Sequence, residues 1–129
     1  MDNIQLEKYK TWLLSNNSDR RDDAVNIFSH TETVDEEIDN ILISLLRTDD
    51  NKHVRRSITH LFIERADKKF LQSFFDALQD DDSFVRGNAY LGLIKLGVSE
   101  NHELLVEYRN DSNHDFERFC INESKAVCV

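Results

Sequence analysis

The chain has 129 residues, of which 40% are hydrophobic and 32% are charged, so it fits one folded domain and is too apolar for a disordered chain. Proline is absent and glycine occurs only three times, which argues against a β-sandwich or β-barrel with a turn every ~8–12 residues. The 25 acidic and 16 basic side chains give a formal net charge of −9, so direct binding to nucleic acid is not expected, because phosphate contacts need lysine and arginine.

The sequence contains no segment that predicts export or membrane insertion. Residues 1–14 lack the ~7–15-residue apolar core of a signal peptide, and no apolar run approaches the ~18 residues of a membrane helix. Cys120 and Cys128 are eight residues apart, which on a helix is about 12 Å along the axis and too far for a disulfide. We therefore expect a cytoplasmic protein with reduced cysteines and no contact with a membrane.

Two interleaved series of helix N-caps run through the chain, and both use residue types whose side chains accept a backbone N–H at a helix start. One series recurs every 32 or 33 residues and comprises Asp2, Asp35, Asp67 and Ser99. The other recurs every 31 to 34 residues and comprises Asn17, Asn51, Asp82 and Asn113. Together they predict eight helices, over residues 2–15, 18–31, 35–47, 51–65, 67–79, 82–96, 99–109 and 113–127.

The helices repeat in pairs. The segment 54–58 recurs as 85–89 in apolar and arginine positions, and more weakly as 20–24 and 116–120. Apolar residues also follow helical spacing, and one such stripe is Ile38, Ile41, Leu42, Leu45 and Leu46. One helix pair cannot bury its stripe alone, so stacked pairs share a continuous core. The sequence therefore predicts an all-α domain over 1–129, with about three helical-hairpin repeats plus a leading and a trailing helix.

Two stretches resemble the HEAT-repeat family, in its short bacterial form. In residues 46–55 and 78–86 a leucine is followed by an aspartate-rich turn and then by valine-arginine, as Val54-Arg55 and Val85-Arg86. Gly97 stands where the family commonly has a closing glycine, and the resemblance covers roughly residues 14–127. It implies a short α-solenoid in which the second helix of each pair lines the inner, concave face. Such a fold identifies little about function by itself.

No residue pattern predicts catalysis or a cofactor. His102-Glu103 is similar to the His-Glu metal ligands of an iron hydroxylase built from HEAT-like repeats, but its counterpart one period earlier is Phe70-Leu71. The other histidines are dispersed and form no metal-binding pair. The sequence also lacks a glycine-rich phosphate loop and a nucleophile motif. We expect no enzyme activity, no metal site and no cofactor.

Aspartates cluster at the turns before three of the predicted helices. They are Asp49 and Asp50, then Asp80, Asp81 and Asp82, and then Asp111 and Asp115. Capping needs only one such residue per helix, so the surplus either supports the turns or is available to a partner. We expect Arg55 and Arg86, which follow two of these turns, to bond to the turn aspartates.

The second helices supply the candidate protein-binding residues. Ile43 and Phe75 share one row, a period apart; they either flank the core or, if exposed, form the apolar centre of a patch rimmed by carboxylates. The residues predicted to contact a partner are Asp39, Ile43, Phe75, Asp76, Asp80, Asp81, Glu103, Glu107 and Asp111.

An acidic chain of this size without catalytic residues is similar to the immunity proteins of bacterial toxin systems. Some of these, in contact-dependent growth inhibition, are HEAT-like helical proteins. The resemblance implies that the chain binds a basic nuclease toxin, a ribonuclease, and covers its active-site cleft with an acidic surface. The alternative is a non-catalytic HEAT-repeat adaptor or scaffold in another protein assembly. In either case we expect a protein partner, and a monomer when the chain is free.

Overall fold

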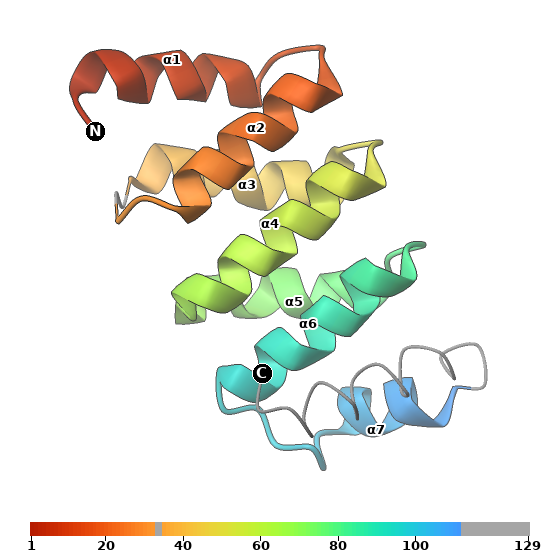
Figure 1. The fold of residues 1–129 in the computed structure, drawn as a ribbon. Helices are drawn as coiled ribbons and strands as arrows, with labels where there is room; N and C mark the ends of the chain where they lie inside the picture. The colour runs from red at the N-terminus through yellow and green to blue at the C-terminus, as the bar shows by residue number, and fades with distance from the viewer. Residues whose placement is uncertain (33–34, 112–129) are drawn as a thin grey trace. The chain divides into compact units, whose positions relative to one another are not determined.

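The computed structural model describes residues 1–32 and 35–111, and within these ranges the chain forms helices and no strand (Figure 1). In chain order the helices are α1 (Asn3–Leu13), α2 (Ser18–Ser29), α3 (Glu36–Thr48), α4 (Lys52–Arg65), α5 (Leu71–Ala77), α6 (Ser83–Lys95) and α7 (Glu103–Asn110). A 3₁₀ turn, η1 (Lys68–Phe70), leads into α5. The all-α class is therefore confirmed, and the first seven predicted helices are present. The eighth, over 113–127, lies outside the described residues together with its cap Asn113 and with Cys120 and Cys128.

Most of the predicted N-caps are confirmed by side-chain hydrogen bonds. The Asp2, Asp35 and Asp82 carboxylates accept the backbone N–H three residues later, at 2.8, 3.0 and 3.1 Å. Asn17 and Asn51 accept N–H groups from the first turn of α2 and α4 in the same way. These bonds satisfy donors that have no partner inside the helix, so each cap fixes where its helix begins.

The predicted cap at Ser99 is wrong. The Ser99 hydroxyl accepts the Asn101 N–H at 3.1 Å within a turn, and α7 begins four residues later than expected. His102 is its N-cap, with the ring Nδ1 accepting the Leu104 N–H at 3.1 Å. The helix before this turn ends in a Schellman motif, in which Gly97 has φ +90° and Val98 N–H bonds to the Leu93 carbonyl.

Contacts divide the chain into two compact units, Met1–Arg65 and Ala66–Val129. In the first unit α1 packs on α2 and α3, while α4 packs on α2 and α3, so α1 and α3 form one layer and α2 and α4 the other (Figure 1). The fully buried apolar side chains of this unit come from all four helices and include Leu13, Val25, Leu42 and Ile58. A single domain over 1–129 stays a prediction.

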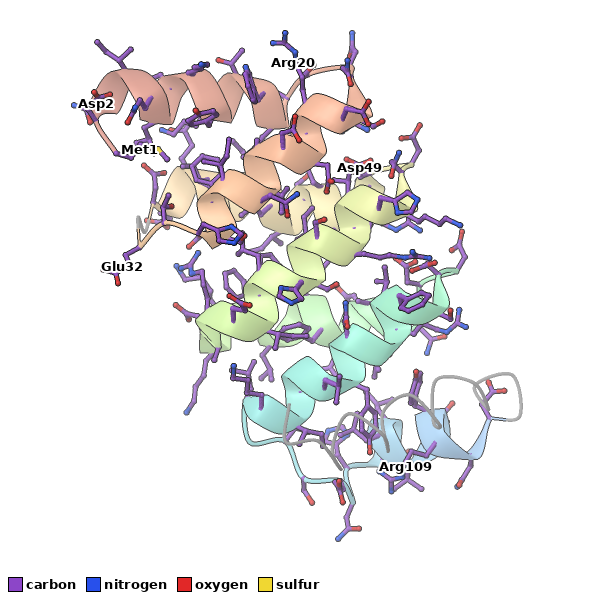
Figure 2. The ribbon with its side chains drawn as sticks, in the orientation of Figure 1. Met1, Asp2, Arg20, Glu32, Asp49 and Arg109 are labelled. Carbon is purple, nitrogen blue, oxygen red and sulfur yellow. The ribbon has the colours of Figure 1, made fainter. Side chains whose placement is uncertain are left out.

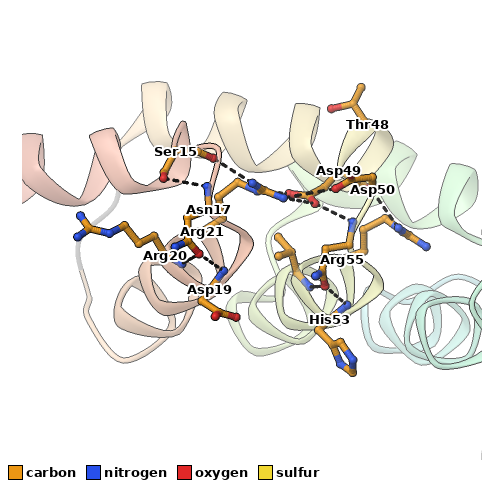
Figure 3. A network of polar contacts seen from close by, with 12 residues as sticks. Ser15, Asn17, Asp19, Arg20, Arg21, Thr48, Asp49, Asp50, His53 and Arg55 are labelled. Carbon is orange, nitrogen blue, oxygen red and sulfur yellow. Dashed lines mark hydrogen bonds and ion pairs between the residues drawn. The ribbon is translucent and has the colours of Figure 1, made fainter.

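A network around Asp49 holds the first unit together at the turn between α3 and α4 (Figure 3). The Asp49 side chain is 1% exposed and accepts two hydrogen bonds from the Arg21 guanidinium, at 2.8 and 3.0 Å. It also accepts the Asn51 N–H at 2.9 Å, while the Asp49 carbonyl accepts Arg55 Nη1 at 2.9 Å. Asp49 therefore joins α2, the turn and α4 in one polar cluster.

The arginine of each repeat has the same local role. Arg21, Arg55 and Arg86 each donate Nη1 to the carbonyl six residues earlier, at 2.9, 2.9 and 2.8 Å. For Arg55 and Arg86 that carbonyl belongs to Asp49 and Asp80, so the predicted bonds to the turn aspartates are confirmed, with the backbone as acceptor. The repeated arginine closes the turn before its own helix.

In the second unit α5 packs closely on α6, and α7 joins them through aromatic and polar contacts. A Cβ added at Gly92 would lie 2.4 Å from the ring of Phe74, so α5 and α6 approach each other at a glycine. Tyr90 of α6 stacks on Tyr108 of α7 with ring centroids 5.5 Å apart. Arg109, labelled on α7 in Figure 2, donates to the Tyr90 hydroxyl at 2.7 Å.

We expect opposite effects on stability from alanine at the two glycines inside α6. Gly92→Ala should lower the free energy of unfolding by about 1–3 kcal/mol, because the new methyl group overlaps the buried Phe74 ring. Gly87→Ala should raise it by about 0.5–1 kcal/mol, because its Cβ meets nothing within 4 Å and alanine favours the helix. Urea unfolding of both variants checks this, and equal stability would contradict the close α5–α6 approach.

Two neighbouring arginines on α2 provide a second test. Arg21→Ala should destabilise the protein by about 3–5 kcal/mol, because it leaves the buried Asp49 carboxylate without its guanidinium. Arg20, whose guanidinium lies 5.2 Å from the Trp12 ring centroid, is the matched control. Arg20→Ala should cost no more than about 1 kcal/mol, since an exposed cation–π contact is weak. Thermal unfolding measures the stability of both variants. A similar loss of stability in the two would contradict the importance of the Arg21–Asp49 contact.

Candidate protein-binding surfaces

Two carboxylates of α7 and one at its C-cap follow one another at the spacing of a helical turn. Glu103, Glu107 and Asp111 are exposed and follow one another at intervals of four residues, so neighbouring members are about one helical turn apart. We call these three residues the acidic stripe. Like charges at this spacing destabilise a helix, and Asp111 stands at the C-terminal end of α7, where the helix dipole disfavours a negative charge. The helix dipole therefore favours the charge of Glu103, in the first turn, and not that of Asp111.

Apolar side chains accompany the acidic stripe. Phe75 of α5 is half-buried, and its ring centroid lies 5.1 Å from that of His102, the residue before Glu103. Leu104 is 45% exposed, while its neighbour Leu105 is buried. Sequence reasoning missed Leu104, although two adjacent leucines on a helix cannot both face the core. Asp76, next to Phe75, is exposed and accepts the side-chain amide of Gln72 at 2.9 Å.

The three aspartates before α6 have different roles. Asp82 caps the helix, and Asp80 is half-buried with its carboxylate accepting the Asp82 N–H at 2.9 Å. Both therefore shape the turn, as Asp49 does two residues before Asn51. Asp81 is exposed. Of this cluster, Asp81 is the member whose position suits contact with a partner.

Asp39, one of the residues that the sequence predicts to contact a partner, is buried. Its side chain is 2% exposed and forms an ion pair with Arg65 of α4, with Oδ2 3.1 Å from Nη2. The signal was present in the sequence, because Asp39 lies three and seven residues before the buried Leu42 and Leu46. Asp39 therefore belongs to the α3–α4 contact. Ile43, also predicted to contact a partner, is half-buried.

The first unit carries an open groove of about 530 Å³ that sequence reasoning missed. Its apolar lining is Leu14, Ile41 and Leu45, and its polar lining is Glu36, Glu37, Asn40 and Ser44. A second hollow of about 380 Å³ shares Leu14 and Leu45 and extends past the end of α3 to Asp49 and Asp50. The helical spacing places Ile41 and Leu45 on an apolar stripe with core residues, but both are only half-buried.

The carboxylates beside this groove are unequally neutralised. The Lys10 ammonium lies 3.0 Å from Glu37, 3.3 Å from Glu7 and 3.7 Å from Asp35. The hydrogen bond to Glu37 is the main reason that the pKa of Lys10 is raised above its ordinary value. Within residues 1–32 and 35–111, no ion pair reaches Glu36. The groove therefore keeps an uncompensated negative charge at the start of α3.

Over the part of the chain that the structure describes, no helix is both long and apolar enough to cross a lipid bilayer. Histidine, cysteine and carboxylate side chains do not gather in groups of three or more that could hold a metal ion, again among the described residues. Two surface features of the described residues are candidate binding sites for a partner, the acidic stripe with its apolar neighbours and the groove of the first unit.

The family model of HEAT repeats matches residues 40–122, which is more than half of the chain. No curated protein and no solved structure matches the chain significantly.

Two aspartates test the division between structural and exposed carboxylates. Asp39→Asn should lower the free energy of unfolding by about 2–3 kcal/mol, because it removes the charge that pairs with Arg65 inside the first unit. Asp76→Asn should stay within about 0.5 kcal/mol of the parent, since this side chain is exposed and the amide can still accept from Gln72. Urea unfolding compares the two variants. An Asp39→Asn variant with the stability of the parent would contradict a structural role for Asp39.

Proposed function

The chain belongs to the HEAT-repeat family, and we propose that it binds a basic protein through the acidic stripe. The observation that carries this proposal is that Glu103, Glu107 and Asp111 follow one another at the spacing of a helical turn. Glu103 and Glu107 are one helical turn apart on α7, and like charges at this spacing repel each other. A partner with lysine and arginine at the same spacing would turn this repulsion into attraction.

The charge of the whole chain supports a basic partner. A formal net charge of −9 repels acidic proteins and attracts basic ones over distances of about a Debye length, ~8 Å at physiological salt. Phe75 and Leu104 add apolar area beside the acidic stripe. A central apolar contact with a charged rim is the usual composition of a protein–protein interface.

Among basic proteins, a nuclease fits this surface well, because its substrate cleft must attract phosphates. We therefore infer a cytoplasmic immunity protein that neutralises a bacterial nuclease toxin, a ribonuclease, by laying the acidic stripe over its active-site cleft. Carboxylates one helical turn apart would occupy the lysine and arginine side chains that otherwise hold the substrate backbone. The same charges would speed the encounter of the two proteins.

An adaptor or scaffold in another assembly is the second candidate, and the groove of the first unit favours it. The apolar part of the lining of that groove is Leu14, Ile41 and Leu45, and inhibition of a nuclease cleft does not require such a groove. The two functions differ in the partner that is recovered. An immunity protein should co-purify with a nuclease encoded by an adjacent reading frame, and it should abolish the activity of that nuclease.

Reversing the charge of the acidic stripe tests the proposed function. In complex with the co-purified nuclease, Glu103→Lys/Glu107→Lys should slow association at least about tenfold and flatten its dependence on salt. The control Asp23→Lys/Glu64→Lys changes the same number of exposed carboxylates on α2 and α4 and should have a small effect. Stopped-flow association measures the rates, and circular dichroism should show the same helix content for both variants.

Apolar contacts should act on the other rate. Leu104→Ala should raise the dissociation rate of the complex and leave its association rate nearly unchanged, because a packed anchor acts after the encounter. An acidic partner, or equal effects of the stripe and control variants, would contradict the proposed function.

A further inference from the structure

The groove and the hollow beside it form one trough along α3. Both are lined by Leu14 and Leu45, the groove also by Glu36 at the start of α3, and the hollow also by Asp50 just past its end. We call this feature the α3 trough. All of its lining residues belong to the first unit, so it shares no residue with the acidic stripe.

The floor of the α3 trough is apolar and accessible. Leu14, at the end of α1, is 66% exposed and lines both the groove and the hollow. Ile41 and Leu45 are four residues apart on α3, so they lie one above the other on the same side of the helix. Their half-buried side chains continue the apolar surface that Leu14 begins. An apolar occupant would remove all three from water.

The walls of the trough carry negative charge at both ends. Glu36 and Glu37 stand at the start of α3, and Asp49 and Asp50 stand at its end, against one lining guanidinium, that of Arg21. Asp49 accepts two hydrogen bonds from the Arg21 guanidinium. The Asp50 side chain is 96% exposed, and its Oδ1 lies 3.5 Å from Nη2 of Arg21. The charges that remain available to an occupant are therefore carboxylates, at Glu36 and Asp50.

The length of α3 limits the shape of the occupant. Its 13 residues span about 20 Å at 1.5 Å per residue. We propose that the α3 trough binds an amphipathic helix of a partner protein, about 13 residues long, with apolar residues on one side and lysine or arginine at both ends. Such a helix matches the apolar floor with its own apolar side and the two acidic ends with its cations. The proposal needs a protein partner but does not depend on that partner being a nuclease.

Selection from a peptide library tests the α3 trough directly. The probe is a displayed library of randomised 13-residue peptides, selected on the full-length protein. We expect enrichment of lysine and arginine near both ends and of leucine, isoleucine or phenylalanine at helical spacing between them. No enrichment, or enriched peptides that are neutral or acidic at their ends, would overturn the proposal.

Variants of the chain then locate the binding. Leu14→Lys and Ser44→Arg each place a cation in the trough at an exposed position, and each should weaken the selected peptides at least about tenfold. Glu103→Lys/Glu107→Lys should leave peptide affinity unchanged, so a failure of the trough and a failure of the acidic stripe are distinguishable. Fluorescence anisotropy measures the affinities, and circular dichroism confirms that the variants are folded.

Two outcomes would contradict the binding of a partner helix in the α3 trough. Retained peptide affinity in both trough variants would overturn the proposal, because the peptides would then bind another surface. Light scattering that shows a concentration-dependent dimer of the free chain, abolished by Leu14→Lys, would also overturn it and make a second copy the occupant.

Discussion

The contact on which the first unit depends is the one between Arg21 and Asp49. A carboxylate that is almost fully buried is costly unless its charge and its hydrogen-bonding capacity are both satisfied. Arg21 supplies the charge and two hydrogen bonds, and the Asn51 N–H supplies a third. Because the guanidinium is rigid and planar, two bonds to one carboxylate fix the orientation of α2 relative to the end of α3. The apolar layers of the first unit can then pack in one arrangement.

Local features of the fold could be predicted from the sequence more reliably than tertiary contacts. The caps at Asp35 and Asp82 were predictable, because capping depends on one side chain and the backbone beside it. The Arg55 contact with the turn was likewise local, since its acceptor is six residues away. The N-cap predicted at Ser99 was wrong because serine both caps helices and forms tight turns. Which of the two it does here depends on the path of the chain after Gly97.

The surfaces were harder to predict because exposure depends on neighbours far away in the sequence. Helical spacing placed Ile41 and Leu45 on an apolar stripe, but spacing cannot tell whether another element covers the edge of that stripe. In the first unit the end of α1 does not fully cover Ile41 and Leu45, and they line the groove. Asp39 shows the reverse case. The sequence around it resembles that of an exposed carboxylate, but the fold places Arg65, 26 residues later, against it.

The acidity of the chain therefore has two origins that respond differently to change. Carboxylates such as Asp49 and Asp39 are bound to arginines inside the fold, so their charge is compensated and adds little to the field around the molecule. Glu36, Glu103 and Glu107 are exposed, and their charge faces solvent. A basic partner would be attracted by this second group, whereas loss of one member of a buried pair from the first group would destabilise the fold. Selection can thus alter the exposed carboxylates to suit a new partner while the buried arginine contacts keep the fold unchanged.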